Sequence, residues 1–142
     1  MALKAVPGSW SKATKALEYA ISNGAKVSSN SYGALSSFGG FKNILDNNPQ
    51  HIFVVASGNN GLELKGSTKF APCSTTWSSN VLCVGNSNKQ DERRWSSNYG
   101  TDYVHVMAPG TDIDSCGHKS INSYVRKTGT RYVFKPYYKV NC

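Results

Sequence analysis

The chain has 142 residues, the length of a single domain, with 39% hydrophobic and 17% charged residues, which is globular composition and not that of a disordered or collagen-like protein. No apolar run approaches the roughly 18 residues of a membrane-spanning helix, and the first eight residues lack the apolar stretch of a signal peptide. Sixteen Lys and Arg against eight Asp and Glu give a net charge of +8, and no acidic residue follows Asp114. We expect a near-neutral body with a solvated basic tail and no nucleic-acid partner.

Two helices and a strand are predicted in the first third of the chain. Apolar residues recur at steps of three and four over residues 11–21, which predicts an amphipathic helix. A short strand is expected at residues 25–27, followed by a Ser-, Gly- and Asn-rich loop over residues 28–40. A second, shorter helix is expected at residues 41–45.

Three continuous apolar runs follow, at residues 51–56, 81–85 and 103–108. Runs of this kind suit strands that are buried on both faces, as in a parallel sheet. The order of elements predicts an α/β fold with a mostly parallel sheet flanked by helices. From Cys116 onward the pattern is lost, and two possible strands in that part cannot be placed: residues 132–134 and 137–140.

The four cysteines permit two disulfides in an oxidising compartment, with three possible pairings. They are Cys73, Cys83, Cys116 and Cys142. No C-x₂-C pair occurs, which argues against a zinc site. Cys83 lies within an apolar run, so a buried thiol is an equal alternative at that position.

Two polar, glycine-containing turns come directly after predicted strands, at residues 28–33 and 57–61. In open parallel sheets, ligands bind beyond the carboxyl ends of the strands. An asparagine amide in such a turn can donate a hydrogen bond to a developing oxyanion. On spacing alone, both segments also fit plain Gly/Asn turns, and neither matches a phosphate-binding loop.

Five short blocks, in order and at consistent spacing, resemble motifs of the subtilisin-like serine proteases (subtilases, peptidase S8 family). They are residues 23–27 (NGAKV) with 30–33 (NSYG), 53–61 (FVVASGNNG), 80–85 (NVLCVG), 95–100 (WSSNYG), and 106–110 (VMAPG) with Ile113 and Ser115. The resemblance implies a subtilisin-like fold, of which residues 1–115 would form the central part of the catalytic domain. Residues 116–142 would then be a divergent basic tail, and the fold would be truncated.

The resemblance also implies roles for individual residues in nucleophilic acyl transfer. Asn59 matches the asparagine that stabilises the oxyanion. Ser31, Tyr32 and Gly33 match the edge strand that pairs with the substrate backbone. The wall of the specificity pocket is matched by Ala56, Ser57 and Gly58.

The three catalytic groups of the family are not matched. Its aspartate and histidine blocks would lie upstream of residue 1, and Arg131 stands where the serine belongs, after Thr-Gly-Thr at residues 128–130. Arginine stays protonated and cannot act as the nucleophile. We expect His51 at the surface, His105 as a structural residue of a strand, and His118 as a tail residue.

These observations predict a fragment of a subtilisin-like serine endopeptidase that is inactive as it stands. The alternative is a pseudoprotease-like protein that binds peptides without catalysis. By family, a peptide or protein is the expected partner and secretion the expected location, while oligomeric state and substrate specificity stay open. We expect no cofactor and no metal, since calcium is suggested by the family alone and Asp112 and Asp114 make no convincing site.

Overall fold

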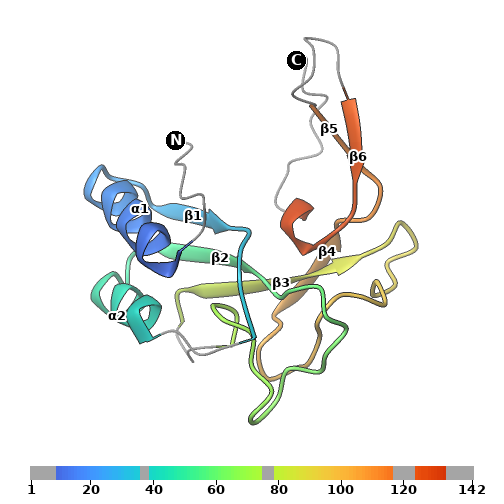
Figure 1. Ribbon diagram of the computed structural model, residues 1–142, viewed down its shortest axis with the longest axis horizontal. Helices are drawn as coiled ribbons and strands as arrows, with labels where there is room; N and C mark the ends of the chain where they lie inside the picture. Colours follow the sequence, from blue (N-terminus) through green and yellow to red (C-terminus); the bar gives the residue numbers. More distant parts are fainter. Residues whose placement is uncertain (1–8, 36–38, 75–78, 117–123, 134–142) are drawn as a thin grey trace.

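The computed structural model describes residues 9–35, 39–74, 79–116 and 124–133 (Figure 1). Its elements are α1 (Trp10–Ser22), β1 (Val27–Asn30), α2 (Gly39–Asn47), β2 (Ile52–Ala56), β3 (Val81–Ser87), β4 (Val106–Pro109), β5 (Ile113–Cys116), β6 (Tyr124–Lys127) and the 3₁₀ helix η1 (Thr130–Tyr132). Within these ranges no helix is long and apolar enough to cross a membrane.

Strands β1 to β4 form one parallel sheet in the order β1-β2-β3-β4. The sheet and its helices confirm the predicted α/β fold class. Strand β1 is the edge strand, and the chain leaves its carboxyl end at Ser31. The first strand extends further than expected, because the predicted loop from residue 28 begins with three residues that pair with β2.

Strands β5 and β6 form a separate antiparallel pair, in which Asp114 lies opposite Arg126. The Arg126 guanidinium donates to both carboxylate oxygens of Asp114, at 2.9 and 3.1 Å. Sequence patterning missed this pair, since a short exposed ribbon needs no apolar face. The pair crosses the predicted boundary at residue 115, and the division into two parts stays a prediction.

Both helices pack on the same face of the sheet, where the core lies (Figure 1). Ser9 caps α1, and its hydroxyl accepts a hydrogen bond from the Lys12 amide at 3.3 Å. On this face Phe53 meets Phe41 of α2 edge to face, with ring centroids 5.7 Å apart. The other buried members of the cluster are Leu17, Ile44, Leu45, Val55, Leu64, Phe70, Cys73, Val81, Cys83 and Tyr103.

The opposite face of the sheet is only partly covered, with Val84 buried and other apolar residues exposed. The register places Val27 beside Ile52, Val54 beside Leu82, and Val84 beside Val106. Side chains of paired residues point to the same side of a sheet, and every second residue along a strand does so too, so these six residues share one face. Four of them are 36–56% exposed: Val27, Ile52, Leu82 and Val106.

His51 is not at the surface as expected but buried, with 3% of its area exposed. Its Nδ1 lies 2.9 Å from the Ala25 carbonyl oxygen, and its ring contacts the Phe53 ring at an interplanar angle of 58°, with centroids 4.5 Å apart. The imidazole thus connects the segments that lead into β1 and β2. Local sequence pattern could not predict this contact, because its two residues are 26 positions apart.

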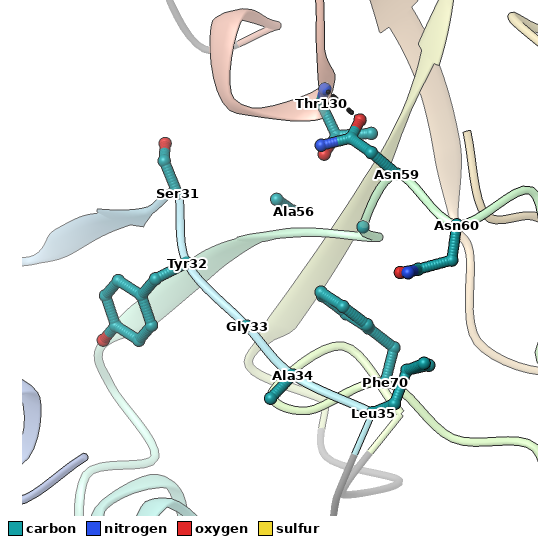
Figure 2. A pocket seen from close by; sticks show the side chains of 11 residues that line it. Ser31, Tyr32, Gly33, Ala34, Leu35, Ala56, Asn59, Asn60, Phe70 and Thr130 are labelled. Carbon is teal, nitrogen blue, oxygen red and sulfur yellow. Dashed lines mark hydrogen bonds between the residues drawn. The ribbon is translucent and has the colours of Figure 1, made fainter. Parts of the chain in front are cut away.

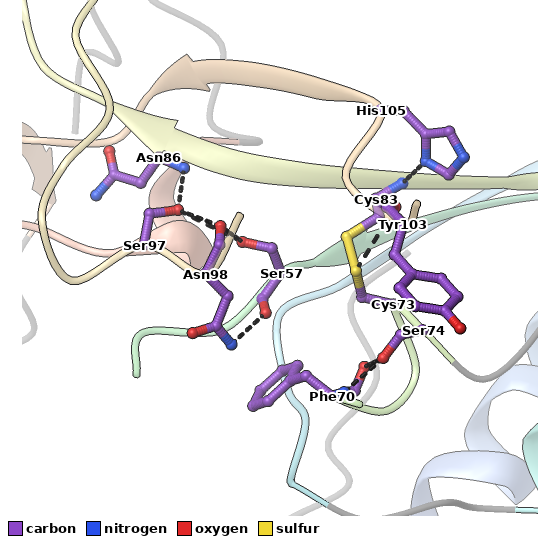
Figure 3. Close-up of a disulfide and its surroundings, with 10 residues drawn as sticks. All are labelled: Ser57, Phe70, Cys73, Ser74, Cys83, Asn86, Ser97, Asn98, Tyr103 and His105. Atoms are coloured by element: carbon purple, nitrogen blue, oxygen red, sulfur yellow. Dashed lines mark hydrogen bonds between the residues drawn. A yellow bond between two sulfur atoms is a disulfide. The ribbon is translucent and has the colours of Figure 1, made fainter. Parts of the chain in front are cut away.

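The third apolar run forms a shorter strand than predicted, since β4 begins at Val106. The preceding Tyr103 is buried in the core as part of a turn, and His105 is exposed. The ring of His105 accepts a hydrogen bond from the Cys83 amide through Nδ1, at 2.9 Å (Figure 3).

Cys83 of β3 forms a disulfide with Cys73, which lies in the connection between β2 and β3 (Figure 3). Both cysteines belong to the buried cluster on the covered face of the sheet. This resolves the alternative of a buried thiol at position 83. Cys142 lies outside the described residues, as do the side chain of Cys116 and all of His118.

Candidate functional site

A pocket of about 360 Å³ opens at the carboxyl ends of β1 and β2 (Figure 2). It is lined by Ser31, Tyr32, Gly33, Ala34, Leu35, Ala56, Gly58, Asn59, Asn60, Phe70 and Thr130. Six of the seven residues singled out in the sequence meet here; the seventh is Ser57. The pocket lies where the carboxyl ends of parallel strands leave a crevice.

The segment after β1 forms one wall of the pocket. The Tyr32 hydroxyl donates to Asn30 Oδ1 at 2.9 Å, and its ring meets Trp10 of α1 edge to face at 6.0 Å. Burial raises the pKa of Tyr32 to about 12, so the phenol is neutral at physiological pH. Gly33 is exposed, and neither its N–H nor its C=O makes a hydrogen bond within the described ranges.

The opposite wall is the turn after β2, which Asn98 holds in shape (Figure 3). Asn98 is fully buried. Its Nδ2 donates to the Ser57 carbonyl at 2.8 Å, and its Oδ1 accepts from the amides of Asn60 and Leu62 at 3.0 Å. The Asn98 amide also donates to the Gly58 carbonyl at 3.0 Å. These four bonds fix the backbone that presents Asn59.

Ser57 does not line the pocket. Its side chain is fully buried on the far side of the turn, and its hydroxyl donates to the Asn98 carbonyl at 3.1 Å. Ala56 and Gly58, the neighbours of Ser57, carry the wall of the pocket instead.

The Asn59 carboxamide is oriented by the segment that enters η1. Its Oδ1 accepts a hydrogen bond from the Thr130 amide at 3.0 Å, as Figure 2 shows. Thr130 is buried, and the Gly129 amide donates to the Gly110 carbonyl at 2.9 Å, which ties this segment to the end of β4. Asn59 itself is exposed, and its Nδ2 makes no hydrogen bond within the described part of the chain. One amide donor therefore faces the pocket in a fixed orientation.

The backbone of Arg131 lies in η1, directly after Thr130, so position 131 is adjacent to the Asn59 side chain. Neither His51 nor His105 lines the pocket, and each has a ring nitrogen engaged with backbone. Within the described ranges, no group of three or more His, Cys, Asp or Glu side chains is arranged to hold a metal ion.

Sequence reasoning missed six residues of the site, which are Ala34, Leu35, Asn60, Phe70 and Thr130 of the pocket lining and Asn98, which holds the turn after β2. Asn98 and Thr130 stood inside quoted blocks, but their contacts with the turn after β2 join positions 36 or more apart in the chain. Phe70 lay outside every motif, and only its place in the fold brings it to the pocket.

The family model of the subtilase family (Peptidase S8) matches residues 3–138. No curated protein sequence matches the chain significantly. Among solved structures, the chain is similar to the prenylagaramide maturation protease PagA, with 25% identity and a TM-score of 0.73 over 94% of this chain and 48% of that one. It is also similar to the S218A mutant of the protease domain of PatA, with 26% identity and a TM-score of 0.71 over 86% of this chain and 44% of that one.

A self-cleaved form of the PatA protease domain gives 26% identity and a TM-score of 0.72, over 86% of this chain and 46% of that one. The chain thus spans about half the length of these protease structures. Their fold agrees with the parallel sheet and flanking helices described above, and the family match covers nearly the whole sequence. The chain belongs to the subtilase family of subtilisin-like serine proteases.

Proposed function

We propose that this chain is the substrate-binding part of a subtilisin-like peptidase. In this proposal an extended peptide binds along Ser31–Gly33, Asn59 donates a hydrogen bond to one peptide carbonyl, and the chain alone does not cleave the peptide. The observation that carries the proposal is the pocket that joins the exposed segment after β1 with the oriented Asn59 amide.

Backbone pairing supplies the affinity. An extended peptide adds to the exposed edge of a sheet through main-chain hydrogen bonds. The exposed Gly33 offers one donor and one acceptor for that purpose. Tyr32 is anchored on Asn30 and Trp10, so the segment keeps its place when a peptide arrives.

The Asn59 side-chain amide donates a hydrogen bond to the carbonyl oxygen of the bound peptide. Because Thr130 holds Oδ1, the Nδ2 donor is preorganised and needs no reorientation when charge develops on a carbonyl oxygen. Such a donor contributes on the order of 3 kcal/mol to acyl transfer. That contribution helps only an attack that another group starts.

The proposal of no cleavage rests on chemistry at position 131. A guanidinium has no lone pair to attack with at neutral pH, and neither of the two described histidines lines the pocket. Without the triad, oxyanion stabilisation and binding leave only roughly 10³–10⁴-fold catalysis over water. Peptides are the expected ligand class because the similar structures are named as a maturation protease and a protease domain.

The test combines binding and cleavage on the purified chain. Fluorescein-labelled alanine-based tetrapeptide amides are titrated by anisotropy, and the same mixtures are followed by mass spectrometry with a fluorophosphonate probe present. We expect saturable binding, intact peptide and no labelled residue. Absence of binding overturns the peptide site, and cleavage or labelling overturns the claim of inactivity.

Asn59→Asp sharpens the test, since it keeps the oxygen that Thr130 donates to and replaces the amide donor with a charged carboxylate oxygen. We expect this variant to bind the peptide at least about 3-fold more weakly, because it loses one hydrogen bond and places a negative charge beside the peptide carbonyl. Asn43→Asp, on the exposed surface of α2, adds the same charge outside the pocket and should bind like the unmodified chain. Equal affinity of all three proteins would contradict the role of Asn59.

A further inference from the structure

Arg93 lies outside the pocket lining, on the segment after β3, and its guanidinium binds backbone carbonyls. Its Nη1 is shared among three carbonyl oxygens, those of Arg94 and Trp95 at 3.2 Å and that of Ser97 at 3.0 Å. Its Cζ lies 4.2 Å from the centroid of the Tyr99 ring, which adds a cation–π contact. Within the described residues Arg93 takes part in no salt bridge, so its charge is directed at the backbone and at one aromatic face.

These contacts shape the turn formed by residues 94–97. The Ser97 amide donates to the Arg94 carbonyl at 2.8 Å, which closes the turn, and the Arg94 amide donates to the Asn86 carbonyl at 2.9 Å, which anchors it to β3. Hydrogen bonds from a charged donor are stronger than neutral ones, and the rigid fork of a guanidinium favours fixed geometry. Arg93 therefore orients three of the four carbonyls of this turn.

The fourth carbonyl of the turn, that of Ser96, contacts the turn that carries Asn59. It accepts a hydrogen bond from the Gly61 amide at 2.8 Å. The two turns lie close together here, since a Cβ placed on Gly61 would lie 3.0 Å from the Trp95 carbonyl oxygen. A change in the direction of the Ser96 carbonyl would therefore be passed to the backbone two residues after Asn59.

Asn98 follows the turn directly, and its four hydrogen bonds hold the backbone of residues 57–62 in place (Figure 3). Arg93 contacts the neighbours of Asn98 on both sides, through the carbonyl of Ser97 and the ring of Tyr99. The guanidinium thus fixes the segment from which the buried Asn98 side chain reaches the turn after β2.

We propose that Arg93 is a positioning residue of the peptide site, which acts through Ser96 and Asn98 to hold the backbone that presents the Asn59 amide. This inference rests on the proposed function and adds to it a residue that does not line the pocket. Lysine cannot replace Arg93 in this role, because an ammonium is a compact point charge without the planar fork of donors.

The experiment measures the dissociation constant of labelled Ala-Ala-Ala-Ala amide for the unmodified chain, Arg93→Lys, Asn59→Ala and the double variant. Arg93→Lys keeps the net charge of the chain. It should weaken binding about 3- to 10-fold, up to the value of the one hydrogen bond that Asn59 donates. In the Asn59→Ala background the same substitution should change the dissociation constant less than about twofold, because the donor that it would misplace is already absent.

Arg94→Lys is the matched control. Arg94 is the direct neighbour of Arg93 and carries the same charge, but its Cζ lies 5.8 Å from the centroid of the Trp95 ring and its Nε donates no hydrogen bond within the described part of the chain. We expect Arg94→Lys to bind the peptide like the unmodified chain. Urea unfolding of each variant verifies that the affinities compare folded proteins.

The outcomes separate the two proposals. If Arg93→Lys binds the peptide like the unmodified chain, or weakens binding by the same factor with and without Asn59, the role of Arg93 is overturned and the peptide site stands. An equal loss in Arg94→Lys also overturns it, since any change of a charged side chain in this segment would then explain the effect. If the unmodified chain binds no peptide, the proposed function fails and this inference fails with it.

Discussion

The two faces of the parallel sheet are built from similar residues but have different surroundings. On one face, Phe53 and Val55 are fully buried beneath α1 and α2. On the other, Ile52 and Leu82 are exposed, although each is a direct neighbour along its strand of a buried residue, Phe53 and Cys83. One face thus packs against both helices, whereas the other is buried at Val84 but leaves part of its apolar surface exposed.

Because both faces carry apolar side chains, we infer that the strands are suited to burial on both faces. Parallel sheets are found almost only with both faces covered. A contiguous apolar surface of this kind marks a place where another element packs. The peptide pocket does not depend on this exposed surface, because its residues lie at the carboxyl ends of β1 and β2.

The largest expected effect separates the two faces directly. Phe53→Ala removes a buried aromatic ring that contacts Phe41 and should lower the free energy of unfolding by about 3–5 kcal/mol. Leu82→Ala, on the open face, should cost less than about 1 kcal/mol. Urea unfolding followed by circular dichroism measures both values. Equal losses would show that the open face is packed in solution.

Removal of the disulfide in the buried cluster should have the next largest effect on the free energy of unfolding. Cys73 and Cys83 are 10 residues apart, and a closed loop of this size restricts the unfolded chain by about 3 kcal/mol in the chain-entropy model. The double variant Cys73→Ala/Cys83→Ala should lose about that much stability in urea unfolding. A loss below about 1 kcal/mol would argue against the pairing of these two cysteines, which peptide mapping without reductant tests independently.

Tyr32, which packs against α1, should make the stability of the fold depend on pH in the alkaline range. Burial raises the pKa of Tyr32 to about 12 in the folded chain, so the unfolded chain releases this proton first as pH rises. Stability from this group is complete below about pH 10 and is lost as pH rises toward about pH 12. Between about pH 9 and about pH 11 the expected loss is about 1 kcal/mol.

Tyr32→Phe isolates this contribution from the other tyrosines. The difference in unfolding free energy between the variant and the unmodified chain should change with pH by that amount. A difference that stays constant over the same pH range would show that Tyr32 is solvated in the folded chain.

The smallest effect on stability is expected on the open face itself. Ile52→Lys should change the unfolding free energy by less than about 1 kcal/mol, because Ile52 is already 48% exposed and a lysine there can extend into water. It should nevertheless reduce the binding of the dye ANS, which reports exposed apolar surface. Ser29→Lys adds the same charge on an exposed position of the same face without removing apolar area. A similar loss of ANS signal in both variants would assign the effect to charge.

The sequence predicted the strands better than their surroundings. The runs at residues 51–56 and 81–85 predicted parallel strands, and β2 and β3 confirm them. The same runs predicted burial on both faces, and the structure confirms this at Ala56 and Val84 but leaves Ile52 and Leu82 exposed. The apolar pattern of a strand indicates which of its faces are suited to burial. Whether a face is in fact buried depends on which other elements pack against it. His51 shows the same limit, since its burial depends on a partner 26 positions away.

The candidate site divides in a similar way. Ser31–Gly33 and Asn59 were singled out because each lies in a short motif beside a strand, and the fold brings them to one pocket. Phe70 and Asn98 act through contacts across the fold, which no local pattern encodes. Sequence therefore indicated the groups that would meet a ligand, but not the residues that shape and hold the cavity around it.

The most direct test of the central claim is an ¹⁵N NMR titration of the chain with Ala-Ala-Ala-Ala amide. We predict that the backbone amide of Gly33 and the side-chain Nδ2 protons of Asn59 shift with one saturable binding curve, while the Asn43 side chain does not. Shifts confined to other residues, or no shift at saturating peptide, would contradict a peptide site at the carboxyl ends of β1 and β2.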